Sequence, residues 1–215
     1  MPDNARSEGI TLPSRTAPSS EFPSYEPVTA SAEFANFMES MRQFQNLVSS
    51  SNPNDDIWRA ATDHLTAINE MLGSHQAAEG RPPAGRALEL PGMGNPLLPA
   101  WQISHAATDG TTLKGQFGRF YLGANKIVFG GVLPLLFDWG FAIALTAAGR
   151  PMSRTAYLNV DYRKPAPIDT DLIVHARVDR VDDRKTTLAA ELIDTDGTVL
   201  AEAETLMIGL QAHHR

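Results

Sequence analysis

Asp138 is the only charged residue between Lys126 and Arg150, in a segment that is otherwise apolar and has the composition of a helix. Burying an unpaired carboxylate is costly, because the charge loses its hydration without compensation. A charge that is retained in such a segment indicates chemistry. A solitary aspartate can also cap a neighbouring strand or pair with an arginine, so a structural role stays open at this point.

A pair of glycines, Gly130 and Gly131, directly precedes the apolar segment. Because proline is tolerated only in the first turn of a helix, Pro134 predicts that the helix starts near Gly131. The first N–H groups of a helix have no intrahelical partners, and they lie at the positive end of the helix dipole. Glycine lets a ligand oxygen approach this backbone closely, which suits the oxyanion formed when a carbonyl is attacked. A Gly-Gly pair before a helix is, by itself, more often a simple turn.

Asp138 lies seven residues after Gly131, or about two turns along the same helix. A carboxylate in that place can act as a general base on a water molecule, or as a nucleophile, towards a carbonyl held at the glycines. The two features together therefore suggest chemistry on a carbonyl group.

The chain divides into five segments by composition and periodicity. Residues 1–28 are rich in proline, serine and threonine and are predicted to be a disordered tail. Residues 29–76 hold two amphipathic patterns, which predict a helical hairpin whose helices pack together and against another part of the protein. Residues 77–104 are rich in proline and glycine and are predicted to be an extended connector. We assign residues 105–209 to one domain and residues 210–215 to a tail.

Strand patterns flank the apolar helix on both sides. One strand is predicted before it at 111–121, and four follow it at 154–162, 172–181, 185–194 and 198–208. Tight-turn signals between the last three strands predict an antiparallel meander. A helix that is apolar nearly all round must be covered on most sides. We therefore predict an α+β fold in which a curved antiparallel sheet wraps around the helix.

Two motifs around the helix resemble those of a known family. The first is Phe129-Gly130-Gly131 followed, after six residues, by Asp138, and the second is T155-A-Y-L-N-V-D-Y-R-K before Pro165. Residues 105–209 resemble the hotdog-fold acyl-CoA thioesterases of the PaaI-like group. The pattern of that group is H-G-G-x6-D on the central helix, with a Ser or Thr seven residues before a Tyr in a later strand. The second motif is similar in spacing to the long-chain acyl-CoA members.

The resemblance implies a hotdog fold and a role for each matched residue. Asp138 would be the catalytic carboxylate, Gly130 and Gly131 the oxyanion turn, and Thr155 the hydroxyl group that positions the nucleophile. The alternative for Thr155 is a place on the polar face of a strand, which it would share with Tyr157, Asn159 and Asp161.

The chain departs from the family pattern at two positions. Phe129 stands in place of the motif histidine, and Gly123 stands where many relatives carry an asparagine, with Asn125 two positions later. We expect Phe129 and Asn125 to lie at the substrate, although Asn125 is as well explained as an ordinary turn residue. Coenzyme A carries several phosphate charges, so Arg163 and Lys164 after the second motif are predicted to bind it. Solvated turn positions are the alternative for these two.

The composition argues against several other functions. The chain has no cysteine, which rules out a thiol nucleophile and thiolate metal sites, and its six histidines show no ligand spacing, so neither metal nor cofactor is expected. Its net charge is −7, without the basic excess that nucleic-acid binding needs. Segment 132–149 approaches the length of a membrane span, but Asp138 and Pro134 argue against insertion. With no signal-peptide pattern at the N-terminus, we expect a cytoplasmic protein.

The expected function is hydrolysis of a fatty or aryl acyl-CoA by a homodimer or a dimer of dimers. A hotdog sheet leaves an open edge, and pairing two subunits edge to edge would place each Asp138 near the glycine turn of the other subunit. The missing motif histidine leaves a second function open, namely binding of acyl-CoA or acyl-lipid without hydrolysis. A structural hotdog domain without a ligand is the third possibility.

Overall fold

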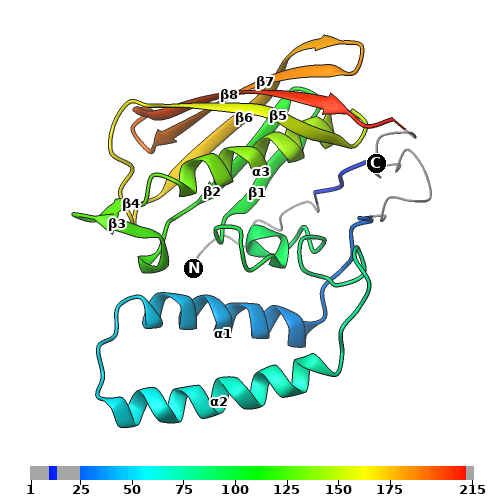
Figure 1. The fold of residues 1–215 in the computed structure, drawn as a ribbon. Coiled ribbons are helices and arrows are strands. Elements are labelled where there is room, and N and C mark those ends of the chain that lie inside the picture. Colours follow the sequence, from blue (N-terminus) through cyan, green and yellow to red (C-terminus); the bar gives the residue numbers. More distant parts are fainter. Residues whose placement is uncertain (1–9, 14–24, 212–215) are drawn as a thin grey trace, which may run out of the picture.

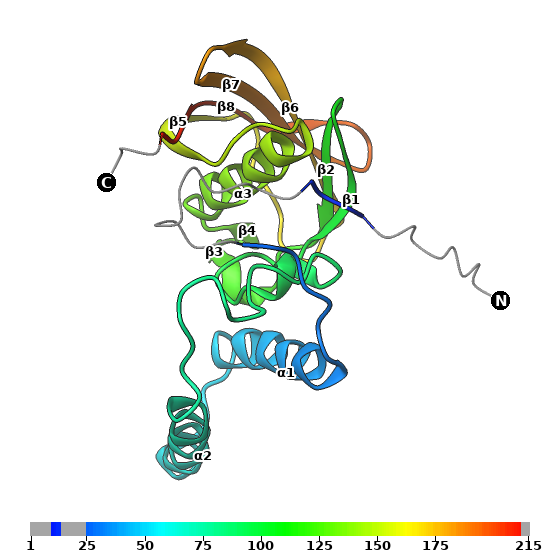
Figure 2. The same ribbon diagram turned by 90° about the vertical axis from the view of Figure 1, so that its right-hand side faces the viewer.

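The structure of the chain is a computed structural model that describes residues 10–13 and 25–211. The predicted disordered tail at 1–28 and the tail at 210–215 therefore fall largely outside the described residues. Figures 1 and 2 show a curved sheet with one long helix against its concave side, and two further helices on the far side of a connector.

The main sheet is antiparallel and has the strand order β1-β2-β6-β7-β8-β5. Its strands are β1 (Gln102–Ala107), β2 (Gly110–Gly115), β5 (Ser153–Tyr162), β6 (Leu172–Asp182), β7 (Lys185–Asp194) and β8 (Val199–Gly209). A small hairpin of β3 (Leu122–Ala124) and β4 (Ile127–Val128) leads into the central helix α3 (Val132–Ala147). A sheet wrapped around one helix in this way is the hotdog fold, as the sequence predicted.

Buried apolar side chains hold helix α3 against the sheet. On the side that faces the sheet, Leu136, Phe137 and Phe141 are fully buried, as are Leu113 of β2 and Leu188 of β7. Burying each such side chain contributes about 1.5–3 kcal/mol to stability. The sheet therefore fixes both the position of α3 and its rotation about its own axis, and thus decides which of its residues face outwards.

The predicted strand at 111–121 is wrong beyond Gly115. After β2 the chain turns inwards, because the buried Phe117 ring packs on Trp101 with 5.0 Å between ring centroids. A short 3₁₀-helix, η2 (Arg119–Tyr121), follows in place of the strand. Strand β1 was not predicted, since Ile103 is its only fully buried residue and its other residues show no clear alternation.

Two helices precede the hotdog core. Helix α1 (Ala32–Val48) is capped by Ser31, and helix α2 (Asp55–Gly73) by Asn54, whose side chains each accept a backbone N–H of the first turn. Figures 1 and 2 show α2 farthest from the sheet, and it contributes no buried side chain. The predicted helices are present, but the prediction that they pack together is wrong, because the apolar side chains of α2 stay exposed and only α1 packs closely on the rest of the protein.

Helix α1 is fastened to the connector and to η2 by polar side chains. Arg42 donates to the carbonyl oxygen of Asn95 at 2.6 Å, and Asn46 accepts the Phe120 N–H at 3.1 Å. The connector includes a short 3₁₀-helix, η1 (Pro91–Gly94), and lies between α1 and α3. Among the described residues, no helix combines the length and the apolar character that crossing a membrane requires.

Candidate active site

Asp138 lies on the half-buried flank of α3 next to β5. The Thr155 hydroxyl group donates a hydrogen bond to the Oδ1 atom of Asp138 at 2.8 Å. No other hydrogen bond to this carboxylate is present among the described residues, so its second oxygen can take part in chemistry. The structure thus brings together the two residues that the motifs predicted to act as carboxylate and positioning hydroxyl group.

A β-bulge at Ala156 turns Thr155 towards the helix. Thr155 pairs with Met207 of β8, whereas Tyr157 pairs with the next residue, Leu206, so one extra residue lies between them on β5. Met207 is buried on the inner face of the sheet, and its partner Thr155 faces the same way. The alternative placing of Thr155 on one face with Tyr157, Asn159 and Asp161 is therefore wrong, because the bulge shifts the alternation by one residue.

The glycine turn at the start of α3 leaves two backbone donors free. Gly131 has φ −65° and ψ −12°, and the first bonds of the turn run from Val132 N–H to Phe129 O and from Leu133 N–H to Gly130 O. Within the described part of the chain, the N–H groups of Gly130 and Gly131 have no protein acceptor. Both glycines are exposed. They therefore offer two donors to an outside oxygen at the positive end of the helix dipole.

Tyr162, at the end of β5, supports this turn. Its hydroxyl group donates to the carbonyl oxygen of Gly130 at 2.9 Å. That carbonyl belongs to the same peptide group as the Gly131 N–H, so the bond fixes and polarises the peptide that presents this donor. No role for Tyr162 was predicted from the sequence, although its place as the tyrosine of the second motif was the available signal.

The carboxylate and the glycine turn of one chain are too far apart to act on the same carbonyl. Seven residues of helix correspond to about 10 Å along the axis. A reacting carbonyl needs its nucleophile and its oxyanion donors within about 3 Å of its atoms. One chain by itself therefore presents two halves of a site rather than a complete one.

Asn125 lies in the turn of the hairpin that precedes α3, and Phe129 directly follows this hairpin. Asn125 and Lys126 have φ angles of 51° and 62°, which is the geometry of a type I′ turn between β3 and β4. The backbone geometry of this turn is enough to explain an asparagine at position 125. Contact between Asn125 and the substrate stays a prediction. Phe129 is 63% exposed, and its ring lies beside Gly131. It thus presents an apolar surface next to the two free donors.

Arg163 and Lys164 follow β5. The Arg163 side chain donates to Glu202 at 2.6 Å and to Asp161 at 3.3 Å, and the hydrogen bond to Glu202 raises the pKa of Arg163 above its usual value. These carboxylates already balance its charge on the outer face of the sheet. Lys164 is exposed, and its backbone N–H bonds to the Leu200 carbonyl. Their predicted contact with coenzyme A phosphates stays a prediction, with Lys164 the freer of the two.

The described residues hold no group of three or more histidine, aspartate or glutamate side chains that could bind a metal ion. What the site does contain is a carboxylate with one oriented oxygen, and an exposed pair of backbone donors. Such a set can activate a water molecule or attack a carbonyl, and can stabilise the resulting oxyanion.

A family model described as the thioesterase superfamily matches residues 125–201. The matched stretch begins at the β3–β4 turn and includes the glycine turn, Asp138, Thr155 and Tyr162. The predicted resemblance to the thioesterase superfamily is confirmed.

Three relatives illustrate the extent of this similarity. The acyl-coenzyme A thioesterase THEM4 of Rattus norvegicus is 28% identical over 96 residues, which are 44% of this chain and 41% of that protein. The chain thus spans about two fifths of the length of this curated relative. A crystal structure of a thioesterase superfamily protein is 24% identical, with a TM-score of 0.70, over 85% of this chain and 97% of that one. A mutant of the phenylacetic acid degradation protein PaaI from Thermus thermophilus is 21% identical, with a TM-score of 0.47, over 51% of this chain and 93% of that one.

The second of these matches extends beyond the hotdog core. The elements from Gln102 to Gly209 make up about half of the chain, so a match over 85% of it must include much of the preceding segment. The arrangement of connector and N-terminal helices around a hotdog core therefore recurs in another solved protein.

Proposed function

We propose that the protein hydrolyses the thioester bond of an acyl-CoA. Asp138 activates a water molecule or attacks the thioester carbonyl, and the Gly130 and Gly131 N–H groups stabilise the oxyanion. Thr155 orients the carboxylate. Acyl-CoA is the proposed substrate because the family match points to thioester hydrolysis and the similar protein THEM4 is an acyl-coenzyme A thioesterase.

The observation that carries the proposal is the 2.8 Å hydrogen bond between Thr155 and Asp138. A carboxylate that merely completed the packing of α3 would not need a threonine turned out of the regular alternation of its strand. The bond holds one carboxylate oxygen and leaves the other without a hydrogen bond among the described residues, which is the arrangement that a general base or nucleophile requires.

We further propose that the active unit is a homodimer, or a dimer of dimers, in which Asp138 of one subunit faces the glycine turn of the other. Strand β5 supports this proposal, because it is a ten-residue strand at the sheet edge with mostly exposed residues. Such an edge invites pairing with another strand. The separation of about 10 Å between the two halves of the site within one chain gives a second, independent reason.

The test is the turnover of a panel of acyl-CoA thioesters with short, medium, long and aromatic acyl groups, followed as free thiol released. Hydrolysis of at least one of them well above the buffer rate is the expected result. No release for any acyl group would contradict the proposal. The absence of cysteine in the chain removes any background from protein thiols, and it is compatible with the reducing cytoplasm that we propose as its location.

A second candidate function is acyl-CoA or acyl-lipid binding without hydrolysis. It is favoured by one observation, the exposed Phe129 ring in the place of the motif histidine. This substitution removes a polar group that would orient the substrate and leaves an apolar contact for it. Measurable binding of the same panel without thiol release would identify this function.

A further inference from the structure

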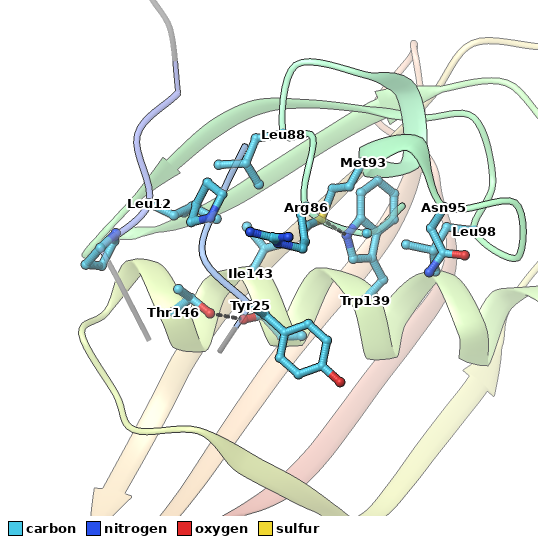
Figure 3. Close-up of a pocket in the computed structure, with 14 residues that line it drawn as sticks. Leu12, Tyr25, Arg86, Leu88, Met93, Asn95, Leu98, Trp139, Ile143 and Thr146 are labelled. Carbon is cyan, nitrogen blue, oxygen red and sulfur yellow. Dashed lines mark hydrogen bonds between the residues drawn. The ribbon is translucent and has the colours of Figure 1, made fainter. Parts of the chain in front are cut away.

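A pocket of about 280 Å³ lies on the side of α3 that faces away from the sheet (Figure 3). The helix supplies its floor with Trp139, Ala142 and Ile143, and the connector and the described N-terminal residues supply its walls, including Leu12, Leu88 and Leu98. The lining side chains are mainly apolar, and none of them is a carboxylate. The N-terminal residues that line the pocket are more than a hundred residues away from the helix residues in the sequence.

The pocket is too large to be a packing defect. Protein interiors are close-packed, and the few voids they contain are seldom much larger than a water molecule. A volume of about 280 Å³ is at the lower end of the range of roughly 300–1,000 Å³ that small-molecule pockets occupy. An apolar space of this size favours a hydrocarbon group over water, because water there would lack polar partners.

The walls of the pocket are held in place by hydrogen bonds between the N-terminal segment and the connector. Arg86 donates from Nε to the Glu26 carbonyl at 2.7 Å, and the Arg86 carbonyl accepts the Val28 N–H at 3.1 Å. The Ala30 N–H donates to the Glu89 carboxylate at 2.6 Å. The guanidinium group of Arg86 is thus engaged with backbone oxygens, and the enclosure is preformed around an apolar interior.

The connector is also tied to the helix at the end of the pocket nearest Asp138. The Trp139 indole N–H donates to the Met93 sulfur at 3.2 Å, as Figure 3 shows. Trp139 is the residue next to Asp138, and Ala142 lies one turn further along the helix on nearly the same side. A chain attached to a carbonyl at Asp138 therefore needs to extend by only about one helical turn to enter the pocket.

We propose that this pocket holds the hydrocarbon part of the acyl group, with the thioester carbonyl at Asp138. The inference rests on the proposed function and adds the substrate class, a medium-length aliphatic acyl chain. The volume is too small for a long chain in full. The lining holds no carboxylate that could pair with an amine, and the guanidinium group of Arg86 is its one charged group, so acyl groups that end in an amine are disfavoured.

The test measures binding separately from hydrolysis. Non-hydrolysable S-alkyl-CoA thioethers with alkyl chains of increasing length are titrated calorimetrically into the full chain. Each methylene that enters the pocket should strengthen binding by about fourfold, the effect of burying one CH₂ group. The gain should stop at the chain length that fills the pocket.

Two variants on α3 show whether the pocket is responsible. Ala142→Leu fills its floor, so the chain length at which affinity stops rising should become shorter, while the affinity for the shortest thioethers stays the same. Ala148→Leu adds the same volume at the end of the helix, outside the lining, and should bind like the unchanged protein. Leu98→Trp fills the opposite wall and replaces Ala142→Leu if that variant does not fold, as judged by thermal melting.

The outcomes separate this inference from the proposed hydrolysis. Chain-length profiles that are identical in Ala142→Leu, Leu98→Trp and the unchanged protein would overturn the pocket assignment, as would an affinity independent of chain length. Hydrolysis with such a flat profile leaves the proposed function standing without the pocket. Chain-length-dependent binding without any hydrolysis contradicts the proposed function and retains the pocket as a binding site.

Discussion

At the scale of residues, the proposed chemistry depends on three side chains placed along the N-terminal half of α3, two from β5 and one from the helix itself. Asp138 carries the charge, Thr155 orients it, and Tyr162 fixes the glycine turn. The last two come from one strand and face the same side of the sheet, because the bulge at Ala156 brings Thr155 back into phase with Tyr162. The strand is therefore a positioning element for both halves of the site.

Asp138→Asn keeps the size of the side chain and can still accept the Thr155 hydrogen bond, but it removes proton acceptance and nucleophilic attack. The rate of thioester cleavage should fall by about 10²–10⁴-fold, the usual contribution of a general base. Stability should be unchanged or slightly higher, because a half-buried charge is neutralised. Single-turnover kinetics measures the rate, and thermal melting of the same sample measures the stability. An active and destabilised variant would rule out the catalytic assignment.

Thr155→Val removes the hydroxyl group and preserves the branched shape of the side chain. The carboxylate then loses its only hydrogen bond from the described residues, and kcat should fall about tenfold, with KM little changed, since about 1.4 kcal/mol corresponds to a factor of ten. Thr155→Ser should restore most of the rate. A fully active valine variant beside an impaired serine variant would show that the packing of the threonine methyl group, rather than its hydroxyl group, is what matters.

Tyr162→Phe removes the hydrogen bond to the Gly130 carbonyl and leaves the ring in place. We expect kcat to fall about tenfold through a less well fixed oxyanion turn, without a matching change in KM. Tyr157→Phe is the matched control, because that hydroxyl group bonds to Glu204 on the outer face of the same strand. If both substitutions reduce kcat alike, the effect belongs to β5 as a whole and the role of Tyr162 in the turn is wrong.

At the scale of elements, the hairpin between β7 and β8 sets the register of these two strands. Strand β5 pairs with β8, so the position of Thr155 depends on the same register. The turn between β7 and β8 is organised by Asp194, whose carboxylate accepts the backbone N–H groups of Thr198 at 2.8 Å and Asp196 at 3.0 Å. The bond from Thr198 is the main reason that the pKa of Asp194 lies below its usual 3.8. Gly197 completes the turn with a φ of 80°.

The lowered pKa of Asp194 predicts a pH-dependent contribution to stability. Its ionised form is favoured in the folded state, so the stabilisation is present above the ordinary pKa of about 3.8 and is lost as the pH falls through the lower, folded value. At pH 7 the free energy of unfolding of Asp194→Asn should therefore be lower than that of the unchanged protein. This gap in unfolding free energy should become smaller near pH 3. Urea unfolding at both pH values measures this gap.

The control for this experiment is Asp196→Asn, because the Asp196 carboxylate accepts neither of these two bonds. It should cost little stability at either pH. A gap between Asp194→Asn and the unchanged protein that is the same at pH 7 and pH 3 would contradict the charge-based explanation and point to the shape of the side chain instead.

At the scale of the whole molecule, the proposed site needs a second subunit to bring its two halves together. The exposed edge strand β5, the exposed glycine turn and Asp138 all lie open in the single subunit. Pairing two such edges would cover the strand and bring the two halves of the site together. The connector and the described residues before α1 cover the other side of α3.

A mixed dimer tests the shared site directly. Asp138→Asn removes one half of the site, and Gly131→Val blocks the other, because a branched side chain covers the turn. The φ of −65° suits any residue, and the exposed Phe129 ring, 3.0 Å from the new Cβ, has to move aside. Each variant alone should be nearly inactive. A heterodimer, isolated through two different tags, contains one intact site and should regain about half of the activity of the unchanged dimer.

The oligomeric state is measured in the same samples by size-exclusion chromatography with light scattering. A monomer at micromolar concentration, or a heterodimer that is as inactive as its two parents, would contradict the shared site. In the second case the carboxylate and the glycine turn would have to meet within one chain, against the separation of about 10 Å along α3.

Local patterns were sufficient for the parts of this protein that depend on neighbours in the sequence. The apolar run and Pro134 determined where α3 begins, and the turn residues determined the meander of β6, β7 and β8. The unusual position of Asp138 and the glycine pair singled out both halves of the site. These features are readable because helix starts, turns and alternation involve residues only a few positions apart.

Only the tertiary structure decided how those parts meet. The sequence did not reveal the bulge at Ala156, since an extra residue becomes visible only when β5 is paired with β8. The bond between Tyr162 and Gly130 joins residues 32 positions apart, and the pocket over α3 joins Leu12 to Ala142. Such contacts depend on strand register and on which side of a helix a distant segment covers. Neither can be predicted from the periodicity within a single segment.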